Sequence, residues 1–114
     1  MKNVCSLLLI TYIFMSCSSD STEDLTEPIP TSVTYSANVK AIIDQSCATT
    51  GCHNSATSQS GLTLENYAQV KSAFQSSNAL GRMESTTNPM PPNGNLPSTS
   101  IDIIKKWRDQ GYLE

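Results

Sequence analysis

The sequence predicts an all-α protein with one small domain. Three segments place apolar residues at helical spacing, and no segment alternates apolar and polar residues through a β-branched run. Residues 35–114 carry these signals and are enough for a single domain with a limited core. Domains of this size often rely on a disulfide, a metal or a cofactor for stability. We therefore expect three or so helices packed around such a group.

The chain begins with the features of an export signal. Lys2 is the only charge before the apolar run 4–15, and a small residue precedes Cys17. The run is shorter than the roughly 20 residues that span a bilayer. The four residues Phe-Met-Ser-Cys that end at Cys17 resemble a bacterial lipobox, which implies that residues 1–16 are a removed signal peptide and that Cys17 is lipidated. An ordinary signal cleaved nearby is the alternative.

Residues 17–34 are expected to be a flexible tether between the lipid and the domain. They contain several acids and two prolines but few large apolar side chains, so they cannot bury a core. Removal of residues 1–16 takes away Lys2 and makes the formal charge one unit more negative than −3. This mild acidity argues against a nucleic-acid partner, which requires a basic surface. The predicted location is the bacterial cell envelope, periplasmic or at the outer-membrane surface.

The first helix is expected to begin at Ser36 and to run into Cys47. Its side chains Val39, Ile42 and Ile43 recur at helical spacing. They would form the apolar face of the helix.

The second helix is expected to open at Thr63 or Asn66, either of which can cap it. Its apolar face would carry Tyr67, Val70 and Phe74. Gly81 lies beyond the expected end of this helix.

The third helix is expected after Pro97, with Thr99 and Asp102 as a capping pair. Trp107 is interpreted as a core aromatic of this helix, and Gly111 as its C-terminal stop. Between the second and third helices, a proline-rich loop holds a methionine. The prolines restrict the backbone, so the loop is expected to be stiff and irregular.

Cys47, Cys52 and His53 form the motif that carries chemistry. His53 is the only histidine of the chain and directly follows the second thiol. Two cysteines followed by a histidine are typical of c-type haem attachment, in which the thiols form thioethers and the imidazole ligates the iron. The usual spacer between the cysteines has two residues, whereas four separate them here.

Three alternatives to haem attachment remain open. A Cys47–Cys52 disulfide is feasible after export, although it closes only a short loop. A structural zinc site needs about four ligands, and the two thiols and His53 supply three. A thiol enzyme would use one cysteine with His53, but sequence neighbours rarely have the geometry of a nucleophile and its base.

A haem would also favour a second ligand opposite His53. Met90, in the proline-rich loop, is the preferred candidate, and Met83 is the competing one. A His/Met pair is typical of electron-transfer haems. The His53 ring is further expected to donate its other N–H to a backbone carbonyl.

From Tyr35 to Leu113 the chain resembles the small single-haem cytochrome c domain found in bacterial lipoproteins and in larger secreted proteins. The matching pieces are the helix entering Cys47, the Cys-His pair, the segment from Gly61 to Tyr67, the Met-Pro-Pro loop and the last helix. The resemblance implies one covalent haem c on Cys47 and Cys52, with His53 and Met90 as iron ligands. It implies an electron carrier that is not an enzyme and that works with redox partner proteins.

The resemblance also implies that Val39 and Ile43 pack against Ile104 and Trp107. Tyr67 is expected to be a wall of the haem pocket. Arg82 is either a counter-ion for a haem propionate or an exposed arginine.

Overall fold

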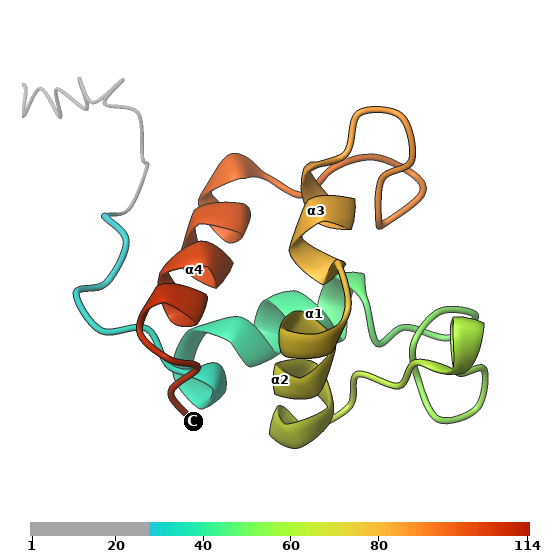
Figure 1. The fold of residues 1–114 in the computed structure, drawn as a ribbon, viewed down its shortest axis with the longest axis horizontal. Helices are drawn as coiled ribbons and strands as arrows, with labels where there is room; N and C mark the ends of the chain where they lie inside the picture. The colour runs from blue at the N-terminus through green and yellow to red at the C-terminus, as the bar shows by residue number, and fades with distance from the viewer. Residues whose placement is uncertain (1–27) are drawn as a thin grey trace, which may run out of the picture.

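The computed structural model describes residues 28–114, and this part of the chain is all-α, which confirms the predicted class (Figure 1). It contains no strand. The signal peptide 1–16 and the lipidation site Cys17 lie outside the described residues. Within residues 28–114 no helix has the length and apolar character needed to cross a bilayer. The elements are η1 (Tyr35–Val39, π-helical), α1 (Lys40–Ser46), η2 (Gln59–Gly61, 3₁₀), α2 (Tyr67–Ser76), α3 (Ala79–Glu84) and α4 (Ser98–Asp109).

The first helix is formed by η1 and α1 without a break and begins earlier than expected. Thr34, and not Ser36, is its cap: the Thr34 Oγ1 accepts a hydrogen bond from the Ala37 N–H at 3.2 Å. The Asn38 side chain in turn accepts from the Thr34 N–H at 3.1 Å. The earlier start brings Tyr35 into the helix, and this side chain is buried.

The second predicted helix is divided into α2 and α3. Asn66 caps α2 as expected, since its side chain accepts from the Gln69 N–H at 3.0 Å. The helix ends at Ser76, and α3 follows after two residues as a separate turn and a half. Gly81 therefore lies inside a short helix that the sequence did not predict.

The last helix, α4, begins at Ser98 directly after Pro97 and has no side-chain cap. The predicted capping pair of Thr99 and Asp102 is wrong, because both residues lie inside the helix. Gly111 ends α4 as expected, with a φ of 82° that suits glycine. The Gly111 N–H donates to the Arg108 carbonyl, and the next N–H donates to the Trp107 carbonyl, which together make a Schellman motif.

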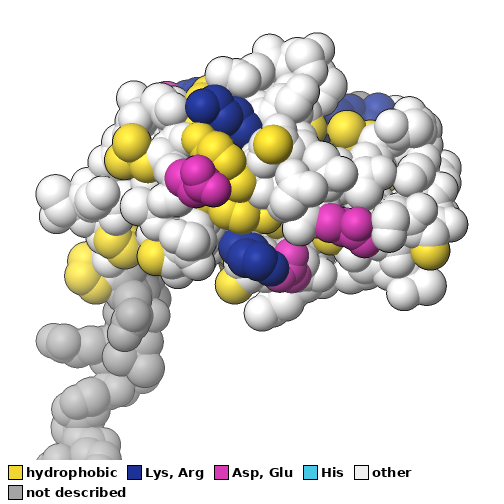
Figure 2. All heavy atoms as spheres, turned by 90° about the horizontal axis from the view of Figure 1, so that it is seen from below, with side chains coloured by type: hydrophobic (Ala, Val, Ile, Leu, Met, Phe, Trp, Pro, Cys, Tyr) yellow, Lys and Arg dark blue, Asp and Glu magenta, His cyan; other side chains and the backbone are white. Residues whose placement is uncertain are grey.

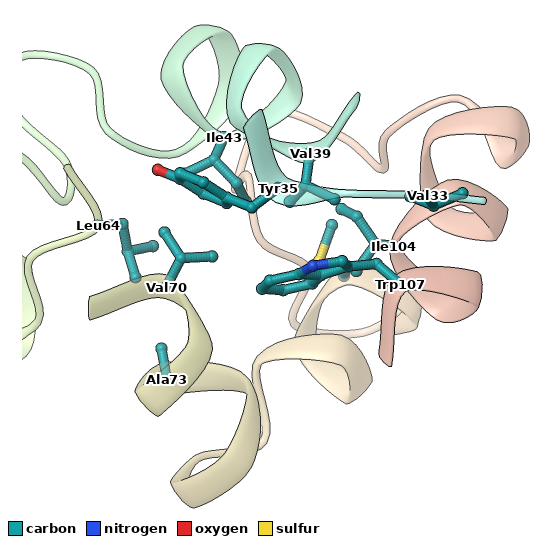
Figure 3. Packing of buried hydrophobic residues seen from close by; sticks show 10 residues of the cluster. Val33, Tyr35, Val39, Ile43, Leu64, Val70, Ala73, Ile104 and Trp107 are labelled. Atoms are coloured by element: carbon teal, nitrogen blue, oxygen red, sulfur yellow. The ribbon is translucent and has the colours of Figure 1, made fainter. Parts of the chain in front are cut away.

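The core lies where α4 crosses the first helix, as the sequence predicted (Figure 3). Trp107 is the largest fully buried side chain, and its indole N–H donates to the Leu113 carbonyl at 2.7 Å. Four other aromatic rings surround it, the nearest being Tyr112 at 4.9 Å between centroids. The ten buried hydrophobic residues are Val33, Tyr35, Val39, Ile43, Leu64, Val70, Ala73, Met83, Ile104 and Trp107.

The segment before the first helix is attached to the C-terminal tail. Val33 is fully buried, and its N–H donates to the side-chain oxygen of Gln110 at 2.8 Å. The Gln110 amide donates back to the Thr31 carbonyl, and the Tyr35 N–H donates to the Leu113 carbonyl. The packed domain therefore extends to Val33, inside the stretch that was assigned to the tether.

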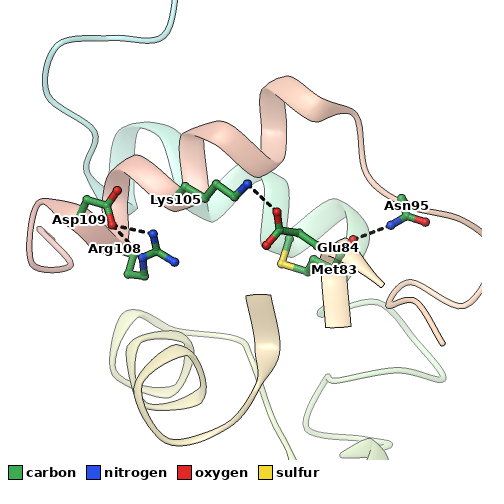
Figure 4. A network of polar contacts seen from close by, with 6 residues as sticks. All are labelled: Met83, Glu84, Asn95, Lys105, Arg108 and Asp109. Atoms are coloured by element: carbon green, nitrogen blue, oxygen red, sulfur yellow. Dashed lines mark hydrogen bonds and ion pairs between the residues drawn. The ribbon is translucent and has the colours of Figure 1, made fainter. Parts of the chain in front are cut away.

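Two long irregular segments, 47–66 and 85–97, lie on the side of the molecule away from α4 (Figure 1). The first connects α1 to α2, and the second connects α3 to α4. The second segment is flanked by α3 and α4, and an ion pair between Glu84 of α3 and Lys105 of α4 joins these two helices (Figure 4). The pair is exposed, so its contribution to stability is on the order of 0–1 kcal/mol.

Candidate functional site

A cavity of about 510 Å³ opens between the end of α1, the two irregular segments and α3. Its volume lies in the range of roughly 300–1,000 Å³ that is usual for cofactor and small-molecule sites. Cys47, Cys52, His53 and Met90 all line it. The four residues selected from the sequence are therefore brought to one hollow, although they come from two distant segments.

The chain between the two cysteines forms a compact turn. The Cys52 N–H donates to the Thr49 carbonyl, and the His53 N–H reaches back to the Cys47 carbonyl, each at 3.0 Å. Gly51 sits at a φ of 85°, a conformation that glycine adopts at little cost. This turn takes up the additional spacer residues, so that both thiols line the same cavity.

The His53 ring is held by a backbone carbonyl, as the sequence predicted. Its Nδ1 lies 3.1 Å from the Leu62 oxygen. A carbonyl oxygen can only accept, so the proton of the neutral ring must be on Nδ1, which leaves the Nε2 lone pair free. The backbone of Leu64 also donates to the His53 carbonyl at 2.8 Å. The imidazole is thus oriented as a ligand with one free nitrogen.

Hydrogen bonds attach the Met90 loop to α3, in addition to the stiffness that its prolines give the backbone. The Met90 N–H donates to the Arg82 carbonyl at 2.9 Å. The Asn95 side chain donates to the carbonyls of Met83 and Ser85 at 2.8 and 3.1 Å (Figure 4). Sequence reasoning missed Asn95, since an asparagine in a loop carries no signal of its partner.

Met83 and Arg82, which precede this loop on α3, also line the cavity. Met83 is only 4% exposed and belongs to the core cluster, whereas Met90 is half-buried. The Arg82 Nε is buried without a hydrogen-bond partner among the described residues, while its Nη2 donates to Asn88 at 3.2 Å. A buried, unpaired guanidinium N–H is costly. The Arg82 side chain lines the cavity and brings its one positive charge to it.

Two aromatic residues, Tyr67 and Trp107, do not line the cavity. The expectation that Tyr67 is a pocket wall is wrong: it is not among the lining residues, and its hydroxyl donates to the Tyr112 carbonyl at 2.7 Å. Trp107 is a core aromatic, as expected. Phe74 of α2 lines the cavity instead. Its helical spacing with Tyr67 and Val70 was the sequence signal that could have indicated this position.

The two cysteines are free thiols in the structure and are not joined by a disulfide. Burial, with a smaller electrostatic effect of the Cys52 thiol, raises the pKa of Cys47 from 9.0 to about 11. Cys47 therefore stays protonated at neutral pH. Within residues 28–114, no three His, Cys, Asp or Glu side chains gather closely enough to hold a metal ion, so the ligand set of a zinc site is not assembled there.

Cys47 of the haem-free protein is expected to react slowly with iodoacetamide. At pH 8 a pKa of about 11 instead of 9.0 lowers the thiolate fraction about 100-fold relative to the unfolded chain. The higher intrinsic nucleophilicity of the more basic thiolate offsets part of this, so a net decrease of roughly 10-fold or more is expected. The rate should keep rising up to about pH 11 in the native protein and level off above about pH 9 in guanidinium. Mass spectrometry of the Cys47 peptide measures both rates, and equal rates would contradict the burial of this thiol.

The chain matches no protein family, no curated protein and no solved structure. What the cavity can do is therefore inferred from its own residues. They offer two thiols, one oriented imidazole, one loop thioether and one guanidinium, that of Arg82.

Proposed function

We propose that this protein is an exported, lipid-anchored electron carrier that holds one covalent haem c. The observation that carries the proposal is the single cavity lined by Cys47, Cys52, His53 and Met90. The thiols of Cys47 and Cys52 would hold the haem as thioethers, and the His53 Nε2 and the Met90 sulfur would ligate its iron. When bound, the haem supplies one-electron chemistry at its iron, and the protein tunes its potential and docking.

The residues present fit such a group in three independent respects. The Leu62 carbonyl orients the His53 ring with Nε2 free, which is the second-sphere contact that ligating histidines usually make. Arg82 lines the cavity and offers a guanidinium cation for a propionate. Apart from Arg82, none of the described lining residues is a Lys, Arg, Asp or Glu, so the cavity favours a largely apolar ligand.

The ligand set favours a carrier over an enzyme. His53 and Met90 would both be taken up in holding the iron, which suits electron transfer rather than substrate binding. A Met90 thioether also raises the reduction potential relative to a nitrogen ligand. The partners would be redox proteins of the cell envelope, reached from a lipid anchor on Cys17.

A haem-stained denaturing gel tests the proposal directly. The protein, made with a cytochrome c maturation system, is expected to retain its haem after acid–acetone extraction, because thioethers survive this treatment. The double variant Cys47→Ser/Cys52→Ser is the matched control and should lose all stain.

A colourless wild-type protein with Cys47 and Cys52 joined to each other would instead support the non-redox, disulfide-stapled envelope lipoprotein. Rapid carbon monoxide binding by the reduced protein would favour a haem sensor or enzyme with a labile Met90.

A further inference from the structure

The two irregular segments that flank the cavity carry almost no charged side chains. From Gln45 to Leu64 and from Ser85 to Ile101 the chain contains no Lys, Arg, Asp or Glu. Glu65 follows the first of these stretches, and Arg82 of α3 is the one Lys, Arg, Asp or Glu among the described residues that line the cavity. The exposed residues that line the cavity are Gly51, Gln59, Ser60, Ser77, Asn78 and Pro92, all uncharged.

A second hollow of about 410 Å³ adjoins the cavity on this face. The two hollows share Ser46, Cys52, Pro91 and Pro92, so Cys52 and the Met90 loop border both of them. The other exposed residues of the second hollow are Gln45, Asn93, Gly94 and Asn95, which are again uncharged. The hollow thus reaches the predicted haem attachment site from outside.

The charged residues of the domain are found mainly on the helices. Lys40 pairs with Asp44 on α1, and Lys105 pairs with Glu84 between α4 and α3. Figure 2 shows most of the charged side chains in the left and middle of the view, with a further blue one at the upper right, while the far right-hand end is mostly white. In Figure 1 that end is the segment 47–66. On this face, charged side chains are therefore sparse over the segment 47–66.

We propose that the uncharged face around the two hollows is the docking surface for the electron-exchange partner, and that the partner meets it with an uncharged, hydrogen-bonding surface of its own. The inference rests on the proposed function. Apart from Arg82, which would face a propionate, the residues that line the two hollows offer no counter-charge, so desolvating a charged side chain of a partner here is unfavourable. Hydrogen bonds to the asparagine and glutamine side chains and apolar contacts with Pro91 and Pro92 remain as the source of affinity.

The place of electron exchange is tested by moving one charge. The variants are compared in two pairs, and the two members of a pair carry equal net charge. The pairs are Asn93→Lys with Ser72→Lys, and Asn93→Glu with Ser72→Glu. Asn93 lines the second hollow, whereas Ser72 is exposed on α2 and lines neither hollow. The oxidation of each reduced holoprotein by ferricyanide is followed by stopped flow. Because each pair has the same net charge, the comparison cancels the effect of the whole-protein charge.

At about 10 mM salt, where the Debye length is about 30 Å, Asn93→Lys is expected to react at least about threefold faster than Ser72→Lys. Asn93→Glu should be slower than Ser72→Glu by a similar factor. Both differences should vanish at about 1 M salt, where the Debye length is about 3 Å. Equal rates at the two positions, or a larger effect at position 72, would overturn the inference.

The haem content and visible spectrum of every variant are recorded first. A protein without covalent haem would refute the proposed function. If haem is present but the rate of oxidation by ferricyanide does not depend on the charge at position 93, only the docking surface is refuted.

Discussion

Replacing Met90 by leucine is expected to remove the weak near-infrared Fe–S band of the oxidised holoprotein. Loss of the thioether should also lower the reduction potential, by on the order of 0.2 V within the roughly 0.8 V range that axial ligands span. The haem should stay covalently attached, since Cys47 and Cys52 are unchanged. Visible and near-infrared spectra with a redox titration measure the effect.

Met83→Leu is the matched control for this experiment. Both methionines line the cavity, but Met83 is 4% exposed within the core cluster. A leucine of similar volume should keep the near-infrared band and cost less than about 1.5 kcal/mol of unfolding free energy. If Met83→Leu removes the band and Met90→Leu retains it, the ligand assignment is reversed.

Replacing Trp107 by alanine is expected to cost about 3–5 kcal/mol of unfolding free energy. The indole is fully buried, contacts Phe74 at 5.9 Å and Tyr112 at 4.9 Å between ring centroids, and donates to the Leu113 carbonyl. The variant removes this packing and leaves that carbonyl without its indole donor. A domain this small is expected to be near the lower end of the usual 5–15 kcal/mol, so the haem-free variant should retain only about 0–2 kcal/mol of unfolding free energy. Chemical denaturation followed by circular dichroism measures the loss.

Leu113→Ala is the control in the same tail. Its side chain is 43% exposed, and the substitution keeps the backbone carbonyl that accepts from Trp107. Its effect should stay within about 0.5 kcal/mol. A comparable loss in both variants would mean that the C-terminal tail as a whole, rather than the indole, stabilises the core.

Local features of the fold were predictable from the sequence where one residue has one chemical role. Asn66 caps α2 and Gly111 ends α4 as expected, because a side-chain acceptor and a left-handed φ are needed at these positions. The caps at Ser36 and Thr99 were wrong, because each helix begins earlier than expected. Tyr35 is buried and extends the first helix toward Thr34, and α4 starts directly after Pro97.

The short helix α3 was not predicted because its stability does not come from local signals. It contains Gly81, has no side-chain cap, and buries a single residue, Met83. Contacts with α2 and α4 hold it in place. For the same reason the partners that hold the site, the Leu62 carbonyl and the Asn95 amide, have no sequence pattern.

The helical class, the core position of Trp107 and the set of candidate ligands could be predicted from residue patterns alone. These depend on helical periodicity and on the chemistry of neighbouring residues, both of which are contained in a few consecutive positions. That Met90 and Arg82 line the same cavity as Cys47, Cys52 and His53 is known only from the folded structure. Convergence of segments that are distant in the chain depends on how the helices pack, and packing is a property of the whole core.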